Sequence, residues 1–218
     1  MNLCSRCIAA AVGGACAIAA TAACSAQAGA AFWFEADALT LTRGTSARLG
    51  GPITPGEAAV LQAISREEIA RAFEGLRIEL RPRGQGAWSV AVRRSIRAGR
   101  SRQLPAAGES LALGPLGGSG AVGVDVVAAE ALRYAPENAP RGVVLEGIGR
   151  GIGRVAVHEF VHQMLGPAIG HNDADADSYE HGSPARRSLY YGRLHWTTAR
   201  PLLERRFAQR GPAPRHRD

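Results

Sequence analysis

The sequence predicts an α+β fold in which one mixed β-sheet packs on a backing helix and on a second helix that carries a histidine motif. Three observations support this fold class. Residues 58–76 and residues 154–165 repeat apolar side chains at helical spacing, and short β-prone segments lie between residues 77 and 128. Because these helices and strands form separate blocks, they favour one sheet with helices gathered on it. A chain of 218 residues has the length of one ordinary domain.

The first half of the chain is expected to contain one helix and three strands. Residues 32–41 form an opening strand with apolar anchors. A helix begins at Thr54-Pro55-Gly56-Glu57, where proline suits the first turn and a carboxylate suits the N-terminal end, and it continues through residues 58–76. Residues 77–81 and 87–93 alternate apolar and polar side chains, so they form two strands on either side of a Pro/Gly turn.

The second half is expected to contain shorter strands and two helices. Residues 111–113 and 122–128 form strands, with a glycine-rich loop at residues 114–120 between them. The helix over residues 154–165 follows, and then a polar, irregular segment. Residues 197–209 form a closing helix with three apolar side chains turned inward.

Glycine occupies every second position from Gly147 to Gly153. No register gives G-x-G-x-x-G, and the chain contains no lysine for a phosphate-binding loop, so we exclude a nucleotide site. These glycines instead permit either a close approach of the motif helix to its neighbours or a loop before its start.

The charge of the chain is strongly positive but carries little information about partners. The formal net charge is +7, and all 26 basic residues are arginines scattered along the sequence. Because no predicted element gathers them, nucleic-acid binding is not expected. Loose attraction to anionic cell-envelope polymers suits the charge better, and we expect a monomer.

The N-terminus has the layout of a secretory signal peptide spanning residues 1–28. A start with one arginine precedes an uncharged, small-residue apolar run from Ile8 to Ala23, and Ala26-Gln27-Ala28 matches a cleavage site. Residues 21–24 offer a lipoprotein alternative with lipidation at Cys24, although threonine stands where leucine is usual. The expected location is therefore secreted or periplasmic.

The predicted cut leaves a catalytic domain over residues 29–211 and a flexible tail over residues 212–218. All four cysteines precede the cut: Cys4, Cys7, Cys16 and Cys24. The mature domain then has neither disulfides nor thiolate ligands, so any metal site must use His, Asp and Glu side chains.

The motif His158-Glu159-Phe160-Val161-His162 carries the predicted chemistry. Residues four apart lie one turn above each other on a helix, so His158 and His162 can present two imidazoles to one Zn2+ ion. Zinc lowers the pKa of a water that it binds, and the carboxylate of Glu159 can accept the proton as general base.

These residues resemble the zincin superfamily of zinc metallopeptidases. The resemblance implies a zincin-like fold, with one mixed sheet packed on a backing helix and the H-E-x-x-H helix. It also implies that the strand before that helix, here residues 122–128, lies at the sheet edge and pairs with an extended peptide. The metzincin extension of the motif is absent: Leu165 and Ala168 stand where that subgroup has glycine and histidine, and no methionine follows Met164.

His171 is the expected third metal ligand, because glycines and a proline at residues 166–170 let the chain turn back from the helix and imidazole suits zinc. Asp177, Asp173 and Glu180 remain alternatives.

A hydrolytic zinc site also needs a hydrogen-bond donor for the oxyanion that develops on the substrate. Candidates are Tyr179, Tyr190, Tyr191 and His195.

The sequence therefore predicts an exported zinc metallopeptidase that cleaves a peptide or protein substrate. The alternative is a cell-envelope protein without catalysis, which either contains zinc or binds polyanions.

Overall fold

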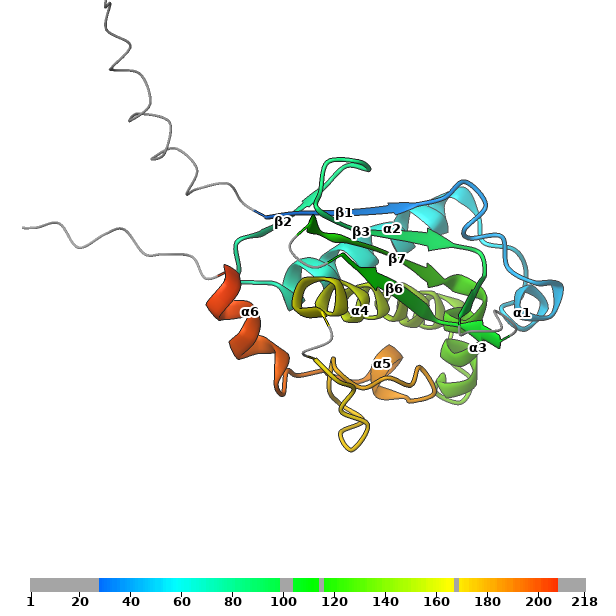
Figure 1. Cartoon of the computed structure of the whole chain (residues 1–218). Helices are drawn as coiled ribbons and strands as arrows, with labels where there is room; N and C mark the ends of the chain where they lie inside the picture. The colour runs from blue at the N-terminus through cyan, green and yellow to red at the C-terminus, as the bar shows by residue number, and fades with distance from the viewer. Residues whose placement is uncertain (1–27, 99–103, 114–115, 167–168, 208–218) are drawn as a thin grey trace, which may run out of the picture.

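The computed structural model describes residues 28–98, 104–113, 116–166 and 169–207 of the chain. Figure 1 labels its helices and strands. In chain order they are β1 (Ala28–Phe34), α1 (Arg43–Arg48), α2 (Pro55–Ala72), β2 (Ile78–Arg81), β3 (Trp88–Arg93), β4 (Ile96–Ala98), β5 (Leu104–Ala106), β6 (Gly108–Ala112), β7 (Gly118–Gly123), α3 (Val124–Tyr134), α4 (Arg141–Leu165), α5 (Ser188–Tyr191) and α6 (Ala199–Phe207).

Five of the strands form one mixed sheet in the order β2-β1-β3-β7-β6. β1 pairs in parallel with β2 and β3, and β3 pairs in parallel with β7. β6 runs antiparallel to β7 and is the last strand on its side. The predicted α+β class with a mixed sheet is confirmed. β2 and β3 are consecutive in sequence, yet β1 lies between them: β2 pairs with residues 28–31 of β1, and β3 pairs with residues 30–34 on its other side.

The backing helix begins where the sequence predicts. The Thr54 side chain accepts from the Glu57 N–H, and the Glu57 carboxylate accepts from the Thr54 N–H at 2.8 Å, which makes a capping box. Arg141, at the start of α4, donates to both Glu57 carboxylate oxygens at 2.6 and 2.9 Å. The first turn of α2 is thus tied to the first turn of α4.

The motif helix is longer than predicted: α4 begins at Arg141, whereas the sequence places its start at residue 154. Glycine disfavours helix, but close packing outweighs that cost. A Cβ at Gly149 would lie 3.0 Å from Ile64, and one at Gly153 would lie 2.6 Å from the Ser65 carbonyl oxygen, both on α2.

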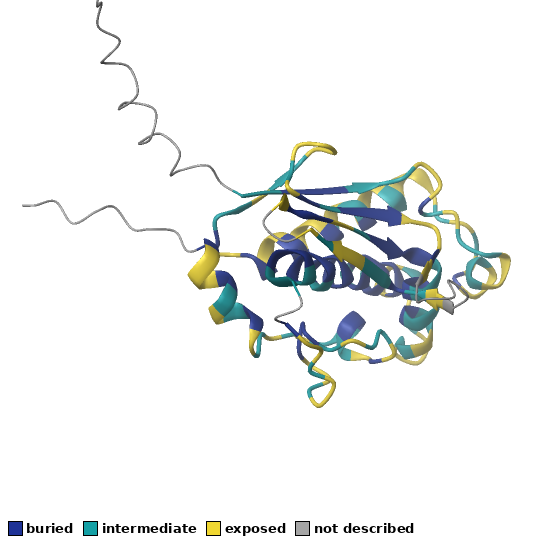
Figure 2. Ribbon diagram, viewed as in Figure 1, coloured by how far each residue is buried: buried dark blue, intermediate teal, exposed yellow. Residues whose placement is uncertain are grey.

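The other two glycines of the run, Gly147 and Gly151, lie on a second face of α4. A Cβ there would come within 2.7 Å of the rings of Tyr191 and Tyr190 respectively. The alternation therefore allows close approach on two faces, and the alternative of a loop is wrong. Figure 2 shows α4 buried along nearly its whole length.

α4 lies beneath the sheet, with α2 behind it and the segment leading to α6 on its other side (Figure 1). Gln163, which is 1% exposed, joins α4 to the sheet: its amide accepts from the Ser89 N–H and donates to the Ser89 carbonyl, both at 3.1 Å. The helix that carries the motif is thereby held in register with β3.

Three sequence predictions about strands need correction. Residues 122–128 are not one strand: β7 ends at Gly123 and α3 begins at Val124, because four of the apolar side chains in α3 pack inward at helical spacing. The loop expected at residues 114–120 is in part β7, and the opening strand ends at Phe34 rather than at residue 41.

Several predictions concern residues outside the described part of the chain. These are the signal peptide except for Ala28, the lipidation candidate Cys24, and the tail at residues 212–218. Within the described part of the chain, no helix combines the length and the apolar character needed to cross a bilayer.

Candidate metal centre

Two donors of the candidate centre lie on consecutive turns of α4. His158 and His162 are four residues apart, so both rings leave the same face of the helix. Their Nε2 atoms are 3.0 Å apart, and their ring planes are nearly perpendicular at 80°. The helix therefore brings two donor atoms to one place on its surface.

The third histidine comes from the segment after α4. Gly166 ends the helix with φ of 64°, which favours glycine. The chain then returns and places His171 Nε2 3.3 Å from that of His158 and 3.1 Å from that of His162. A side chain at Gly182 would collide with the His171 ring, so glycine is needed there.

The spacing of the three Nε2 atoms fits a tetrahedral metal ion. Imidazole nitrogens bound at about 2.0–2.1 Å with tetrahedral angles lie about 3.3–3.4 Å apart. The separations here are 3.0, 3.1 and 3.3 Å. His158, His162 and His171 can therefore hold a metal ion, and three protein donors leave a fourth position open, as catalytic sites do.

The protonation of the cluster also suits a metal. His158 Nδ1 lies 2.9 Å from the Tyr179 carbonyl oxygen, which fixes the proton on Nδ1 and leaves the Nε2 lone pair free. Burial lowers the pKa of His158 to about 4 and lowers that of His162. Both rings are neutral at pH 7, and metal binding requires neutral imidazole.

Glu159 lies beside the cluster and faces β6. It is 6% exposed, and its carboxyl packs so closely on Gly108 that any side chain at 108 would overlap it. Burial raises the pKa of Glu159 to about 7, although a side-chain hydrogen bond with Ser110 acts in the opposite direction. A carboxyl group with a pKa near neutrality can both accept and release a proton.

Two of the alternatives for the third ligand, Glu180 and Asp173, have other partners. Glu180 is buried and accepts from the backbone N–H groups of Thr197, Thr198 and Ala199, the last at 2.7 Å, so it caps the start of α6.

Asp173 accepts from the Gly182 N–H at 2.9 Å, and the side chain of Asp177 is exposed. Neither belongs to the histidine cluster, which is the one group of potential metal ligands found among the described residues.

Three of the four predicted oxyanion donors are engaged elsewhere. The Tyr190 hydroxyl donates to the Pro184 carbonyl at 3.0 Å, and that of Tyr191 donates to the Ala131 carbonyl at 2.8 Å. His195 Nε2 lies 2.8 Å from an Asp175 carboxylate oxygen.

Tyr179 is the one predicted donor that lines the cleft around the metal centre. Its ring stacks on Trp196 with centroids 4.5 Å apart. The charged side chains that act on its hydroxyl group are those of Arg154, Glu68 and Arg71.

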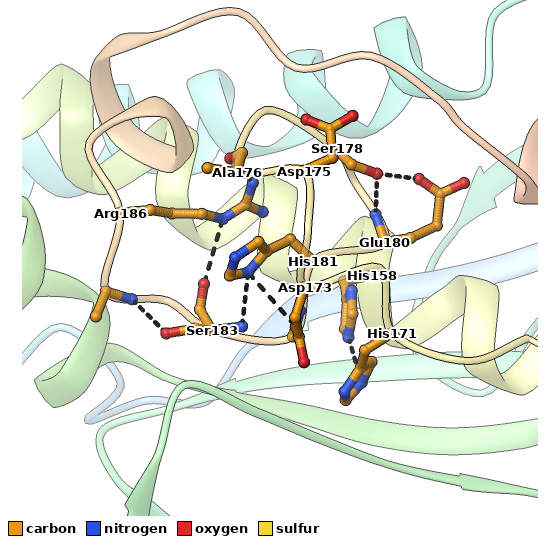
Figure 3. Close-up of polar contacts among 12 residues, drawn as sticks. His158, His171, Asp173, Asp175, Ala176, Ser178, Glu180, His181, Ser183 and Arg186 are labelled. Carbon is orange, nitrogen blue, oxygen red and sulfur yellow. Dashed lines mark hydrogen bonds and ion pairs between the residues drawn. The ribbon is translucent and has the colours of Figure 1, made fainter.

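His181 also lines this cleft, although it was not among the residues predicted for the site. Its Nδ1 accepts from the Ser183 N–H at 3.0 Å, so the neutral ring carries its proton on Nε2. Figure 3 shows its ring beside Asp173, whose carboxylate oxygen is 3.8 Å from Nδ1. The signal available in the sequence was its place in the stretch rich in Asp, His and Tyr that follows the motif helix.

A buried ion pair supports the same helix and was also missed. Arg154, on α4, donates to Glu68 of α2 at 2.9 Å, and both side chains are at most 6% exposed. Arg154 also donates to three backbone carbonyls around α5, those of Ser188, Leu189 and Gly192. A single arginine thus connects α2, α4 and the segment around α5.

The cleft that contains these groups has a volume of about 670 Å³. α4 contributes His158, Glu159 and His162, β6 contributes Gly108, and residues 181–184 form another wall.

Comparisons with protein-family models, with curated proteins and with solved structures gave no match for this chain. Conclusions about its function therefore depend on the geometry of this cleft.

Proposed function

We propose that this protein is a zinc-dependent peptidase of zincin type. The observation that carries the proposal is the triangle of Nε2 atoms from His158, His162 and His171, with the buried carboxyl of Glu159 next to it. Three imidazole donors favour zinc over calcium or magnesium, which prefer oxygen ligands. When bound, zinc would polarise the scissile carbonyl and lower the pKa of the attacking water.

Glu159 would move the protons of the reaction. It accepts a proton as water adds to the carbonyl carbon, and it passes that proton to the amine when the C–N bond breaks. The products are one carboxylic acid and one amine, so the atoms of peptide and water balance. The burial that raises the pKa of Glu159 to about 7 suits both steps.

His181 is the best-placed group to stabilise the oxyanion. Its proton is on Nε2, and it lines the cleft beside Gly182, which packs on His171. A preorganised N–H aimed at the developing charge is worth about 10²- to 10³-fold in rate.

β6 takes the substrate-binding role that the sequence analysis gave to residues 122–128. It is the edge strand of the sheet, and Glu159 packs directly on its Gly108. An extended peptide that pairs with β6 would therefore pass in front of the histidine cluster.

Export to the periplasm or the cell exterior belongs to the same proposal. The described residues contain no cysteine, so the metal centre needs no thiol and suits an oxidising compartment.

The deciding experiment measures metal content and peptide cleavage on the same preparation. We expect about one zinc per chain in the purified protein and hydrolysis of internally quenched peptides. Glu159→Gln should retain the zinc and lose about 10²- to 10⁴-fold in kcat. Glu137→Gln, an exposed carboxylate outside the cleft, is the matched control and should change neither.

Undiminished cleavage by Glu159→Gln would contradict the mechanism. Stoichiometric zinc without hydrolysis of any peptide would favour the non-catalytic zinc protein. Absence of zinc, with binding to anionic polymers that weakens in salt, would favour the polyanion-binding alternative.

A further inference from the structure

Two buried arginines line the cleft, and their surroundings differ. Arg154 is 6% exposed and Arg186 is 7% exposed. Removing a guanidinium from water is costly unless a negative charge or a full set of hydrogen bonds replaces the water. Arg154 has the carboxylate of Glu68 at 2.9 Å and three backbone carbonyls.

Arg186 has no such counter-ion among the described residues. Its Nε donates to the Ser183 carbonyl at 3.2 Å, and its Nη1 donates to the Ala176 carbonyl. Both acceptors are neutral, and Nη2 has no partner in the described part of the chain. Figure 3 shows the Arg186 side chain close to His181, among residues of the segment that follows α4.

The nearest carboxylates do not neutralise Arg186. Asp175 and Asp177 favour its charged form, but neither comes within the 4.0 Å of an ion pair in the described structure. Asp175 instead accepts from the Asp177 N–H at 3.0 Å and lies 2.8 Å from His195 Nε2. Burial consequently lowers the pKa of Arg186 in spite of these two acids.

The rest of the cleft is poor in negative charge. Among the described side chains that line it, Glu159 is the one acidic residue, and a metal ion would add further positive charge. An anion that entered the cleft would meet no other negative charge among the described lining side chains, since Asp175 and Asp177, which act on Arg186, do not belong to that lining. A guanidinium offers a carboxylate two parallel N–H donors, which makes such a contact selective as well as strong.

We propose that Arg186 binds a carboxylate of the substrate, so that this enzyme prefers peptides with an acidic group close to the scissile bond. This inference rests on the proposed peptidase function. The carboxylate can belong to an Asp or Glu side chain or to the C-terminus of the peptide, since both present the same two oxygens. Ser183 places this subsite beside His181, because its carbonyl accepts from Arg186 and its N–H donates to His181.

The test compares matched peptides that differ only in this charge. One set of internally quenched, alanine-based peptides carries Glu or Gln at each position on either side of the centre. A second set carries a free or an amidated C-terminus. We expect kcat/KM to be about 10- to 100-fold higher for the acidic member of the best pair, the effect of one hydrogen-bonded charge. The set that shows the preference identifies the source of the carboxylate.

Variants then assign the preference to one residue. Arg186→Met should cleave the acidic and the amide peptides equally, whereas Arg186→Lys should retain part of the preference because it keeps the charge but not the paired donors. Arg187→Met is the control, because the neighbouring Arg187 is exposed and does not line the cleft. Zinc content and thermal unfolding are measured for each variant, and Arg186→Lys serves if the methionine variant does not fold.

The outcomes separate the two proposals. If the wild-type protein cleaves peptides without any acidic preference, the Arg186 subsite is overturned and the peptidase function stands. The same conclusion follows if the acidic preference survives in Arg186→Met. If no peptide is cleaved, binding of the same pairs is measured by calorimetry. Tighter binding of the acidic peptide, lost in Arg186→Met, then supports the subsite while the peptidase proposal fails. Equal binding of both members overturns the subsite as well.

Discussion

The two halves of the candidate metal centre are built differently. His158 and His162 come from α4, which is buried along most of its length and hydrogen-bonded to β3 through Gln163. His171 is exposed and comes from the segment between α4 and α6, which contains little regular structure (Figure 2). One half is positioned by helix geometry, and the other by a few specific contacts.

The half that contributes His171, here called the loop half, is held in place mainly by Glu180. Its carboxylate caps α6, and its carbonyl accepts from the Asn172 N–H at 3.0 Å, one residue after His171. Since Gly182 then packs on the His171 ring, the ligand depends on residues about ten positions later in the chain. A segment with little regular structure can therefore be as specifically arranged as a helix.

Removal of one of the three histidine side chains should have the largest effect on zinc binding. We expect His162→Ala and His171→Ala each to weaken zinc binding more than 100-fold, because each leaves two of three donors, whereas changes beyond the ligands cost about 10- to 100-fold. Competition with a fluorescent chelator measures the affinity. Unchanged affinity in His171→Ala would show that the loop half does not bind the metal.

The next largest effect is expected for Glu180→Gln, which should disturb the loop half and leave the helix half unchanged. It replaces a charged acceptor of three N–H groups by an amide, so we expect a loss of about 1–3 kcal/mol of stability and about 10-fold in zinc affinity. Hydrogen exchange should rise in residues 169–198 and stay constant in α4. Glu204→Gln, on the exposed side of α6, is the control. Equal exchange in both regions would mean that the halves are not independent.

Gly153→Ala should disturb the helix half through packing. A Cβ at Gly153 would lie 2.6 Å from the Ser65 carbonyl oxygen and 2.8 Å from Glu68 Cβ, so we expect destabilisation of about 1–3 kcal/mol in denaturant unfolding. Gly142→Ala has open space around the new methyl group and should instead stabilise by up to about 1 kcal/mol, from helix propensity alone. Equal effects at both sites would contradict the close approach of α4 to α2.

The smallest effect concerns the start of α4, far along the helix from the metal centre. Hydrogen bonds from Arg141 lower the pKa of Glu57 to about 2, below its ordinary value of 4.5. A carboxyl with a depressed pKa contributes stability above its unfolded pKa and loses that contribution as the pH falls through the folded pKa. The difference in melting temperature between wild type and Glu57→Gln should therefore be constant above pH 5 and shrink between pH 4.5 and 2. Zinc affinity at neutral pH should not change.

Local patterns predicted those parts of the fold that depend on neighbours in sequence. The capping box at Thr54, the alternation that became β2 and β3, and the four-residue spacing of His158 and His162 are of this kind. The prediction failed at α3, where a β-branched run packs as a helix, and at the glycine run of α4. Intrinsic preferences of a few tenths to one kcal/mol are easily outweighed by burial.

The sequence by itself determined the two helical histidines and the carboxyl of Glu159, because a helix fixes which residues share a face. It ranked His171 first but could not exclude Asp173, Asp177 or Glu180, since a loop has no period from which to infer direction. Only the tertiary structure brought His171 to the helix, assigned Glu180 to the start of α6, and buried Arg186 without a counter-ion among the described residues. Those outcomes depend on contacts between residues that are distant in sequence, and such contacts form only when the whole domain packs.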